Sequence, residues 1–282
     1  MACFRLDRND FLGHTVTDTI ANSPDKRLSF LSYPKDNVLR PVWRGVLNWV
    51  GKKPIRLRNT RPIISFAFDD FPRTALSEGA RILEGAGARG TFYTALGLAG
   101  TINSLGEQFQ KEDLHELVER GHELASHTFD HVSARDVSNS SFLLNVRRGE
   151  QLMQPMTGLT PSSNFAYPFG CANVRLKVKV GRLMQSCRGN FPGLNGQVTD
   201  LNLLRANALY GGSEALNSAV KLVEANSRSN SWLIFYTHDV RHAPSKFGCT
   251  PELLEALLKV ISSQDCRIMS IADVVTHEGA TN

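Results

Sequence analysis

The chain has 282 residues, of which 41% are hydrophobic and 21% charged, with a formal net charge of +5. This composition is typical of a globular protein with a large core, and no apolar run reaches the roughly 18 residues that a membrane-spanning helix needs. The five cysteines are scattered without a C-x-x-C spacing, which excludes a disulfide framework and a structural zinc site and predicts reduced thiols.

The first part of the chain predicts an irregular extension. Residues 1–60 show weak periodicity and several prolines, whereas a regular pattern begins near residue 61, so we expect a basic extension over 1–60 and a barrel domain over 61–282. The first ten residues carry charges where a secretory signal would need an apolar stretch, and we therefore expect a cytoplasmic location.

A strongly basic segment lies within this extension. No acidic residue occurs between positions 37 and 68, while seven arginine and lysine residues do. Trp43, Val46, Leu47 and Val50 have helical spacing, which predicts a short amphipathic helix. Either this helix packs against the barrel, or the basic segment 40–61 contacts an anionic membrane surface or an acidic polymer. Nucleic acid is not expected as a partner, because aromatic residues do not alternate with the basic ones.

From residue 62 onward, predicted strands and helices alternate. Apolar runs rich in β-formers predict strands at 63–68, 90–94, 123–126, 164–167, 232–237 and 267–271. Helical periodicity predicts helices at 73–84, 112–120, 141–154, 174–184, 213–225 and 251–262. Such alternation is typical of a parallel sheet, and six or seven repeats favour a closed α/β barrel. The glycines of 85–90 spell G-x-G-x-x-G, but they follow a helix and precede a strand, the reverse of a dinucleotide site.

Polar residues that can carry chemistry stand at the ends of these strands. Asp69 and Asp70 follow the first strand, and His127 and His131 follow the third strand, four residues apart, a spacing that lets both imidazoles reach one cation. His238 ends the strand at 232–237. Two histidines and one carboxylate would leave positions on a metal open for water and substrate.

Each feature has a structural explanation when it is taken alone. Asp70 precedes Pro72 and could cap a helix, His238 could be a capping residue, and the stretch 165–170, which contains Tyr167-Pro168-Phe169-Gly170, could be a simple turn. Because all of them follow strands of one repeating α/β chain, and active sites of barrels lie where strands end, we expect them to meet on one barrel face.

The order Phe-Asp-Asp, Ser-His-Thr-x-x-His, Tyr-Pro-Phe-Gly and a strand ending in Thr-His resembles the polysaccharide deacetylase family, the NodB-homology carbohydrate esterases. The resemblance covers roughly residues 62–275. It implies a distorted barrel of about seven parallel strands. It also implies a metal-dependent hydrolase that removes N-acetyl groups from an amino-sugar polysaccharide, oligosaccharide or lipid-linked glycan.

The resemblance also implies a role for each motif residue. Asp69 would be the general base and His238 the general acid, and Tyr167, Pro168 and Phe169 would form the motif that offers a backbone N–H to the oxyanion. Asp70, His127 and His131 would bind a divalent metal, Zn²⁺ above all, with Co²⁺ or Ni²⁺ as alternatives.

The sequence departs from the family pattern at three places. The family often has glycine after the aspartate pair, but here the residue is Phe71, which we expect to narrow the pocket. Many members place arginine two residues before the motif proline to orient the base, and here that residue is Ala166. Arg188 is a weak candidate for the replacement, chosen for its charge and plausible placement. The aspartate-containing fourth motif is not evident.

Other functions remain open from the sequence. A relative of the same fold would hydrolyse a non-sugar amide or a cyclic ureide. Two histidines and a carboxylate also suit a non-haem iron oxygenase, although the second adjacent carboxylate then has no role. A non-catalytic glycan-binding protein could keep the same pocket. The sequence does not predict the oligomeric state.

Overall fold

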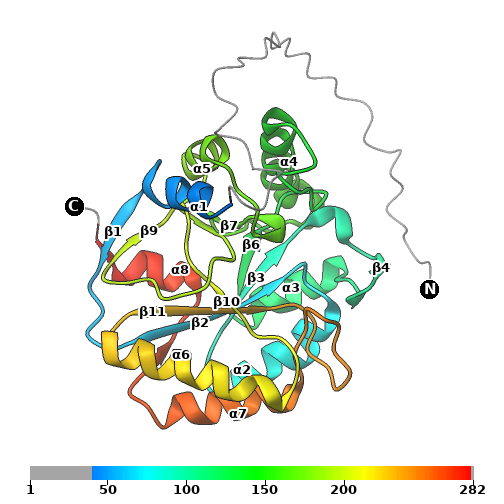
Figure 1. The fold of residues 1–282 in the computed structure, drawn as a ribbon. Helices are drawn as coiled ribbons and strands as arrows, with labels where there is room; N and C mark the ends of the chain where they lie inside the picture. Colours follow the sequence, from blue (N-terminus) through cyan, green and yellow to red (C-terminus); the bar gives the residue numbers. More distant parts are fainter. Residues whose placement is uncertain (1–39, 281–282) are drawn as a thin grey trace, which may run out of the picture.

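The computed structural model describes residues 40–280, with side chains described for 45–278. The expected irregular extension therefore lies outside the described residues up to position 39, as does the side chain of Trp43. The centre of the fold is a sheet of eight strands (Figure 1). Its main path runs through β10 (Asn207–Ala208), β11 (Trp232–Thr237), β2 (Ile63–Asp69), β3 (Thr91–Thr94), β6 (Glu123–Ser126), β7 (Asn164–Ala166) and β8 (Ser186–Arg188).

Every strand pair in this sheet is parallel, and β12 (Arg267–Ile268) pairs beside the first residues of β2. At one end of the path, β8 makes irregular backbone contacts with residues 201–204, which precede β10 in the chain. The N–H of Cys187 donates to the carbonyl of Leu201, and the N–H of Leu204 donates to the carbonyl of Cys187. The expected α/β class, with a distorted barrel of about seven parallel strands, is confirmed.

The strands are buried on both faces, which explains why they read as continuous apolar runs. Successive side chains of a strand point to opposite faces. In β2 this places Ile64, Phe66 and Phe68 in the layer under the helices, and it places Ile63 and Ala67 inside the barrel. The same alternation directs Asp69, the last residue of β2, toward the barrel interior.

Helices cover the outside of the sheet. A π-helical turn at Ala75–Ala80 leads into α2 (Arg81–Gly85), and the later helices are α3 (Lys111–Glu119), α4 (Asn139–Thr157), α5 (Val174–Gly181), α6 (Leu216–Ser229), α7 (Pro251–Ser262) and α8 (Ile271–Asp273). In Figure 1, α2, α6 and α7 lie on one side of the barrel, whereas α4 and α5 lie on the opposite side. The side chains of Ser138 and Thr250 accept hydrogen bonds from backbone N–H groups and cap α4 and α7.

A second sheet closes the barrel at the end opposite the strand carboxyl ends. In it, β1 (Pro54–Leu57) pairs antiparallel with β9 (Val198–Asp200) and β13 (Gly279–Ala280). Ile55 and Leu57 are buried against the interior residues of the barrel. Residues 54–57 therefore form part of the folded unit, although the sequence pattern placed them in the extension.

The helix expected in the basic segment lies within α1 (Arg40–Trp49). Leu47 is fully buried, and its carbonyl accepts a hydrogen bond of 2.7 Å from the buried ammonium group of Lys177. Lys177 also forms a 2.6 Å ion pair with Asp200, so α5 and β9 together hold the end of α1. Trp49 and Val50 are exposed.

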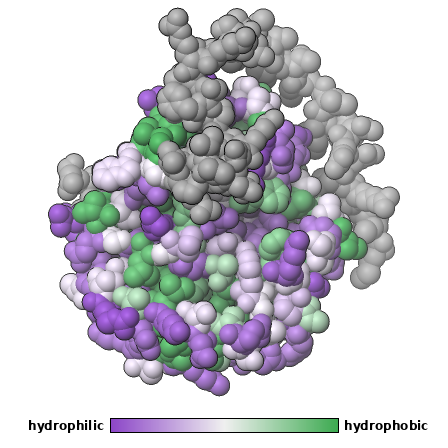
Figure 2. Space-filling model, in the orientation of Figure 1, coloured by the Kyte–Doolittle hydropathy of each residue, from purple (hydrophilic) through white to green (hydrophobic). Residues whose placement is uncertain are grey.

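No helix within residues 40–280 is long and apolar enough to cross a membrane. On the face drawn in Figure 2, hydrophilic side chains surround the hydrophobic ones. A short hairpin of β4 (Ile102–Asn103) and β5 (Gly106–Glu107) projects beside the carboxyl end of β2, where Pro72 forms a bridge with Gln108.

Candidate active site

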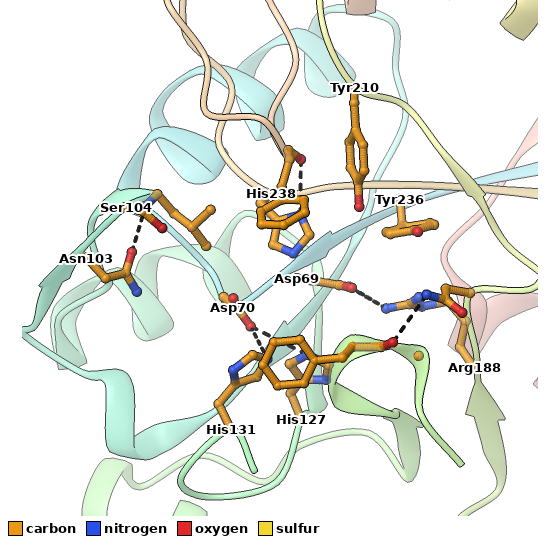
Figure 3. Close-up of a pocket in the computed structure, with 15 residues that line it drawn as sticks. Asp69, Asp70, Asn103, Ser104, His127, His131, Arg188, Tyr210, Tyr236 and His238 are labelled. Atoms are coloured by element: carbon orange, nitrogen blue, oxygen red, sulfur yellow. Dashed lines mark hydrogen bonds and ion pairs between the residues drawn. The ribbon is translucent and has the colours of Figure 1, made fainter. Parts of the chain in front are cut away.

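A cavity of about 430 Å³ opens at the carboxyl ends of the barrel strands. Figure 3 shows its lining residues converging from β2, β8, β11 and the loops that follow the strands. The lining contains both aspartates of the first motif, both histidines of the second, Arg188, His238 and several aromatic residues. The barrel thus brings together most of the residues that the motifs had singled out.

Asp70, His127 and His131 form a compact set of metal-binding groups. One ligand atom from each lies within 4.8 Å of the other two. The Nε2 atom of His131 lies 3.0 Å from Oδ1 of Asp70, and the Nε2 atom of His127 lies 3.5 Å from the same oxygen. That oxygen is buried and has no hydrogen-bond partner of good geometry among the described residues. Buried polar atoms usually have a partner, so this oxygen fits the role of a metal ligand.

The protonation state of His127 suits metal binding. Its Nδ1 lies 2.8 Å from the carbonyl oxygen of Ala166, which makes Nδ1 the protonated nitrogen and leaves a lone pair on Nε2. Burial lowers the pKa of His127 to about 4, so the imidazole is neutral at pH 7. A neutral imidazole with its second nitrogen tied to a carbonyl is the usual form of a metal-binding histidine.

The charge of Asp70 is also stabilised. Burial alone would raise the pKa of this carboxyl group, but the neighbouring imidazoles of His131, His127 and His238 outweigh it and hold the pKa well below its usual range. Asp70 therefore stays an anion, the form that binds a cation.

The loops that carry these residues hold unusual backbone conformations. Six non-glycine residues of the described chain have positive φ, and five of them lie in the site loops. These five are Asp70 (65°), Phe71 (62°), Thr128 (65°), His131 (53°) and Phe169 (57°). Left-handed conformations cost L-residues energy and persist where the surrounding packing imposes them, which is typical of functional sites.

Asp69 lies beside the metal set and contacts Arg188. One guanidinium nitrogen, Nη2, lies 2.5 Å from each carboxylate oxygen of Asp69. Arg188 is almost fully buried, and although burial alone would lower its pKa, the charge of Asp69 raises it. Arg188 thus contacts the carboxylate that the sequence pattern had assigned as the base.

The position of Arg188 explains the alanine in the third motif. Ala166 on β7 and Arg188 on β8 are register partners on neighbouring strands. Because the methyl group of Ala166 occupies little of the interior, the arginine of the next strand has room to reach Asp69.

His238 lies across the cavity from this pair. Its Nδ1 is 3.1 Å from the carbonyl oxygen of Phe247, so the imidazole is oriented by a backbone group. The neighbouring Asp239 is fully buried and contacts Ser245 and Arg241 instead of the imidazole. The sequence shows no recognisable fourth motif with an aspartate to support His238. In the structure, a backbone carbonyl and not an aspartate orients this imidazole.

The third motif lines the cavity with Phe169 and Gly170. Tyr167 is buried between Phe142 and Phe165 in the layer beneath α4 and α5, and its ring does not line the cavity. The buried Pro168 does not line the cavity either. Phe169 does, with its ring 4.7 Å from that of His131. Gly170 follows at φ +62°, where a Cβ would meet the side chain of Asn190.

Phe71 does not narrow the pocket, contrary to the expectation from its sequence position. Its ring is fully buried in the outer core, where it packs on Phe92 and Phe109 at centroid distances of 5.0 and 5.3 Å. The direction of a side chain at a positive-φ position does not follow from the strand pattern, and here it points away from the cavity.

Sequence patterns missed several lining residues. Tyr210, Tyr236 and Phe247 form an aromatic wall around His238, with the ring of Tyr210 5.6 Å from that of Tyr236 and 5.9 Å from that of Phe247. Asn103 and Ser104 reach the cavity from the β4–β5 hairpin. Tyr236 lies on β11, two residues before His238. Because alternate residues of a strand point to the same face, this spacing could have indicated that Tyr236 faces the cavity.

With this geometry established, comparisons with known proteins place the chain. The family model for polysaccharide deacetylase matches residues 56–184, which hold the aspartate pair, both histidines and the third motif. Over this stretch the chain is similar to the polysaccharide deacetylase family, and the resemblance carried by the motifs is confirmed. A search of curated proteins finds no match.

Solved structures share the fold. A chitin deacetylase from the fungal pathogen Colletotrichum lindemuthianum superposes with a TM-score of 0.54 at 15% identity, over 82% of this chain and 96% of that one. The Xyl-CE4 domain of a multidomain xylanase from the hindgut metagenome of Trinervitermes trinervoides gives 0.53 at 16% identity, over 77% and 91%. A family 4 carbohydrate esterase from Streptomyces lividans gives 0.50 at 16% identity, over 78% and 97%.

Proposed function

We propose that this protein is a metal-dependent deacetylase that removes N-acetyl groups from an amino-sugar polysaccharide, oligosaccharide or lipid-linked glycan. The observation that carries the proposal is the meeting, in one cavity, of Asp70, His127 and His131 with the Asp69–Arg188 pair and His238. The family match supports the reaction class.

Asp70, His127 and His131 would hold a divalent cation, because one carboxylate and two imidazoles suit Zn²⁺, Co²⁺ or Ni²⁺. Such an ion lowers the pKa of bound water toward about 7 and polarises a carbonyl group. The unpartnered oxygen of Asp70 and the free Nε2 of His127 fit this role.

The remaining residues supply proton transfer and charge stabilisation. Asp69 would accept a proton from the attacking water, while Arg188 holds its carboxylate in place. The backbone N–H of Phe169 would donate to the oxyanion, and a single such donor is typically worth about 2.7–4 kcal/mol in the transition state. His238 would protonate the departing amine, so that acetate and a free amino sugar leave the site.

Acetate release from a panel of N-acetylglucosamine oligomers tests this proposal. We expect release that stops with a chelator and returns with Zn²⁺, Co²⁺ or Ni²⁺. Asp69→Asn should keep metal binding but lose turnover, whereas Asp136→Asn, a control at an exposed aspartate, should behave as the wild type. Full activity of Asp69→Asn would contradict the assignment of the base.

The same assay separates the alternatives. Hydrolysis of non-sugar amides or cyclic ureides without release from sugar oligomers would assign the site to that substrate class. Glycan binding without any turnover in the metal-loaded protein would identify a non-catalytic relative. Oxygen consumption with an oxo-acid would identify an oxygenase, which has no support from the family match.

We also propose that the exposed end of α1 contacts an anionic membrane surface. Trp49 is 78% exposed, and the ammonium group of Lys52 lies 4.3 Å from its ring centroid. Arg56 on β1 and Arg58 directly after that strand are exposed as well. Exposed tryptophan beside lysine and arginine is typical of surfaces that bind acidic lipid headgroups. A cytoplasmic location, which would suit a lipid-linked glycan, stays a prediction.

Co-sedimentation with vesicles tests this contact. We expect binding to phosphatidylserine vesicles, less binding to phosphatidylcholine vesicles, and a loss of binding in Trp49→Ala/Lys52→Glu. Point substitutions are needed because removal of residues 1–55 would cut into β1, which begins at Pro54. Unchanged binding of the double variant would rule out this surface.

A further inference from the structure

The guanidinium group of Arg188 is buried between two tyrosine rings. Its central carbon lies 5.0 Å from the ring centroid of Tyr93 and 4.9 Å from that of Tyr236. Tyr93 is fully buried and Tyr236 lines the cavity. Close approach of a guanidinium to aromatic faces is favourable, and it gains strength where water is excluded.

The two rings approach from opposite sides of the strand that carries the base. Tyr93 on β3 is the register partner of Asp69, and Tyr236 on β11 is the register partner of Ala67. All four side chains belong to the inward-facing set, while Arg188 reaches them from β8, which lies three strands beyond β3 in the sheet order. Figure 3 shows Tyr236 beside the Arg188–Asp69 pair.

The contact between Arg188 and Asp69 is not a bidentate fork. Both oxygens of Asp69 accept from the same nitrogen, Nη2, instead of from two parallel N–H groups. Nη1 donates to the carbonyl of Gly189, and Nε has no partner among the described residues. A bidentate fork would fix the mutual orientation of the two groups, whereas contact through one nitrogen leaves a rotation free.

We propose that Tyr93 and Tyr236 are positioning residues that hold the Arg188 guanidinium between their rings and thereby orient the carboxylate of Asp69. The inference rests on the proposed function, because it assigns Asp69 as the base. It deepens that function by naming two aromatic residues, each on a strand next to β2, on which the geometry of the base depends.

Tyr93 offers a matched pair of variants. Its hydroxyl group is buried and has no hydrogen-bond partner among the described residues, so Tyr93→Phe keeps the ring and loses no bond. We expect Tyr93→Phe to keep near wild-type kcat. Tyr93→Leu should lower kcat about 10- to 100-fold, the typical loss when a group that supports a functional residue is removed. KM should change little, because Tyr93 does not line the cavity.

A double-mutant cycle separates positioning from general damage. If the rings act through Arg188, Tyr93→Leu should cost little further activity in an Arg188→Met background. Equal losses in both backgrounds, or an equal loss in Tyr93→Phe, would overturn the proposal. Tyr236→Leu, at a half-buried position, provides a second variant if Tyr93→Leu does not fold.

A crystal structure of Tyr93→Leu or Tyr236→Leu gives a readout that needs no activity. We expect the guanidinium of Arg188 to tilt and its contact with Asp69 to lengthen. An unmoved Arg188–Asp69 pair would overturn the positioning role. If the wild type releases no acetate from any substrate, the proposed function fails, while the crystal structures still decide whether the rings hold Arg188.

Discussion

At the scale of single residues, Phe71 shows how packing can outweigh backbone strain. It occupies a left-handed conformation that glycine adopts freely, and its ring fills the outer core between Phe92 and Phe109. The left-handed conformation costs a residue with a side chain roughly 1–2 kcal/mol. Loss of a buried phenylalanine ring costs about 3–5 kcal/mol. Because the packing of the ring outweighs the strain, phenylalanine is favoured over glycine at this position.

We therefore expect Phe71→Gly to be less stable than the wild type by about 1–4 kcal/mol, the difference between these two effects. Denaturant unfolding of both proteins measures this change. A Phe71→Gly protein that is as stable as the wild type would show that relief of strain dominates at this position.

His127 couples the site to pH through its burial. Its pKa is about 4 in the folded protein, below the usual value of about 6.5, so between these pH values the unfolded chain binds a proton that the folded protein does not. The free energy of unfolding must then rise with pH across this window. The change is on the order of 3 kcal/mol.

For metal-free protein, we expect stability to fall as the pH is lowered from 6.5 to 4. His127→Gln should flatten this dependence, because glutamine does not titrate. Urea unfolding at several pH values, with chelator present, gives the measurement. Parallel pH profiles for wild type and His127→Gln would disagree with a neutral, buried imidazole.

At the scale of elements, either of two neighbouring strands can supply the arginine that contacts Asp69, the proposed base. Ala166 and Arg188 face each other on β7 and β8, so the arginine that the family often carries on one strand stands here on the next. A side chain from either position enters the same part of the barrel interior. The strand register, and not the position in the motif, decides which arginine can reach Asp69.

This register predicts the outcome of an exchange. Arg188→Ala should lower kcat about 10- to 100-fold because Asp69 loses its partner. Ala166→Arg/Arg188→Ala should recover part of that loss, because an arginine returns to the interior opposite the lost one. Steady-state kinetics of both variants test the idea, and a double variant no better than Arg188→Ala would argue against exchangeable positions.

The elements also show which parts of the fold could be predicted. Strands β2 and β11 were evident because burial on both faces produces long apolar runs. In contrast, β8 and β10 have three and two residues, too few for any periodicity, and β9 pairs outside the main sheet. These short elements follow from the closure of the barrel, which no local pattern encodes.

At the scale of the whole molecule, some site residues could be predicted from a short stretch of sequence, whereas others depend on contacts between distant parts of the chain. His127 and His131 lie four residues apart, and Asp70 directly follows a strand that is easily recognised. Arg188 and its partner Asp69 are 119 residues apart, so only its charge and plausible placement singled out the arginine. Tyr93 and Tyr236 read as ordinary strand residues, and the burial of the Tyr167 ring in the core was not evident from its motif. Contacts that depend on the curvature of the sheet become visible only in the folded barrel.

The proposed chemistry depends on one cation held between Asp70, His127 and His131. Anomalous diffraction from crystals grown with Co²⁺ or Zn²⁺ tests this most directly. We expect a single strong peak bonded to the Asp70 carboxylate and to Nε2 of both histidines, at about 2.0–2.2 Å as for zinc sites generally. A peak elsewhere, or three side chains that turn away from one another with metal present in excess, would contradict it.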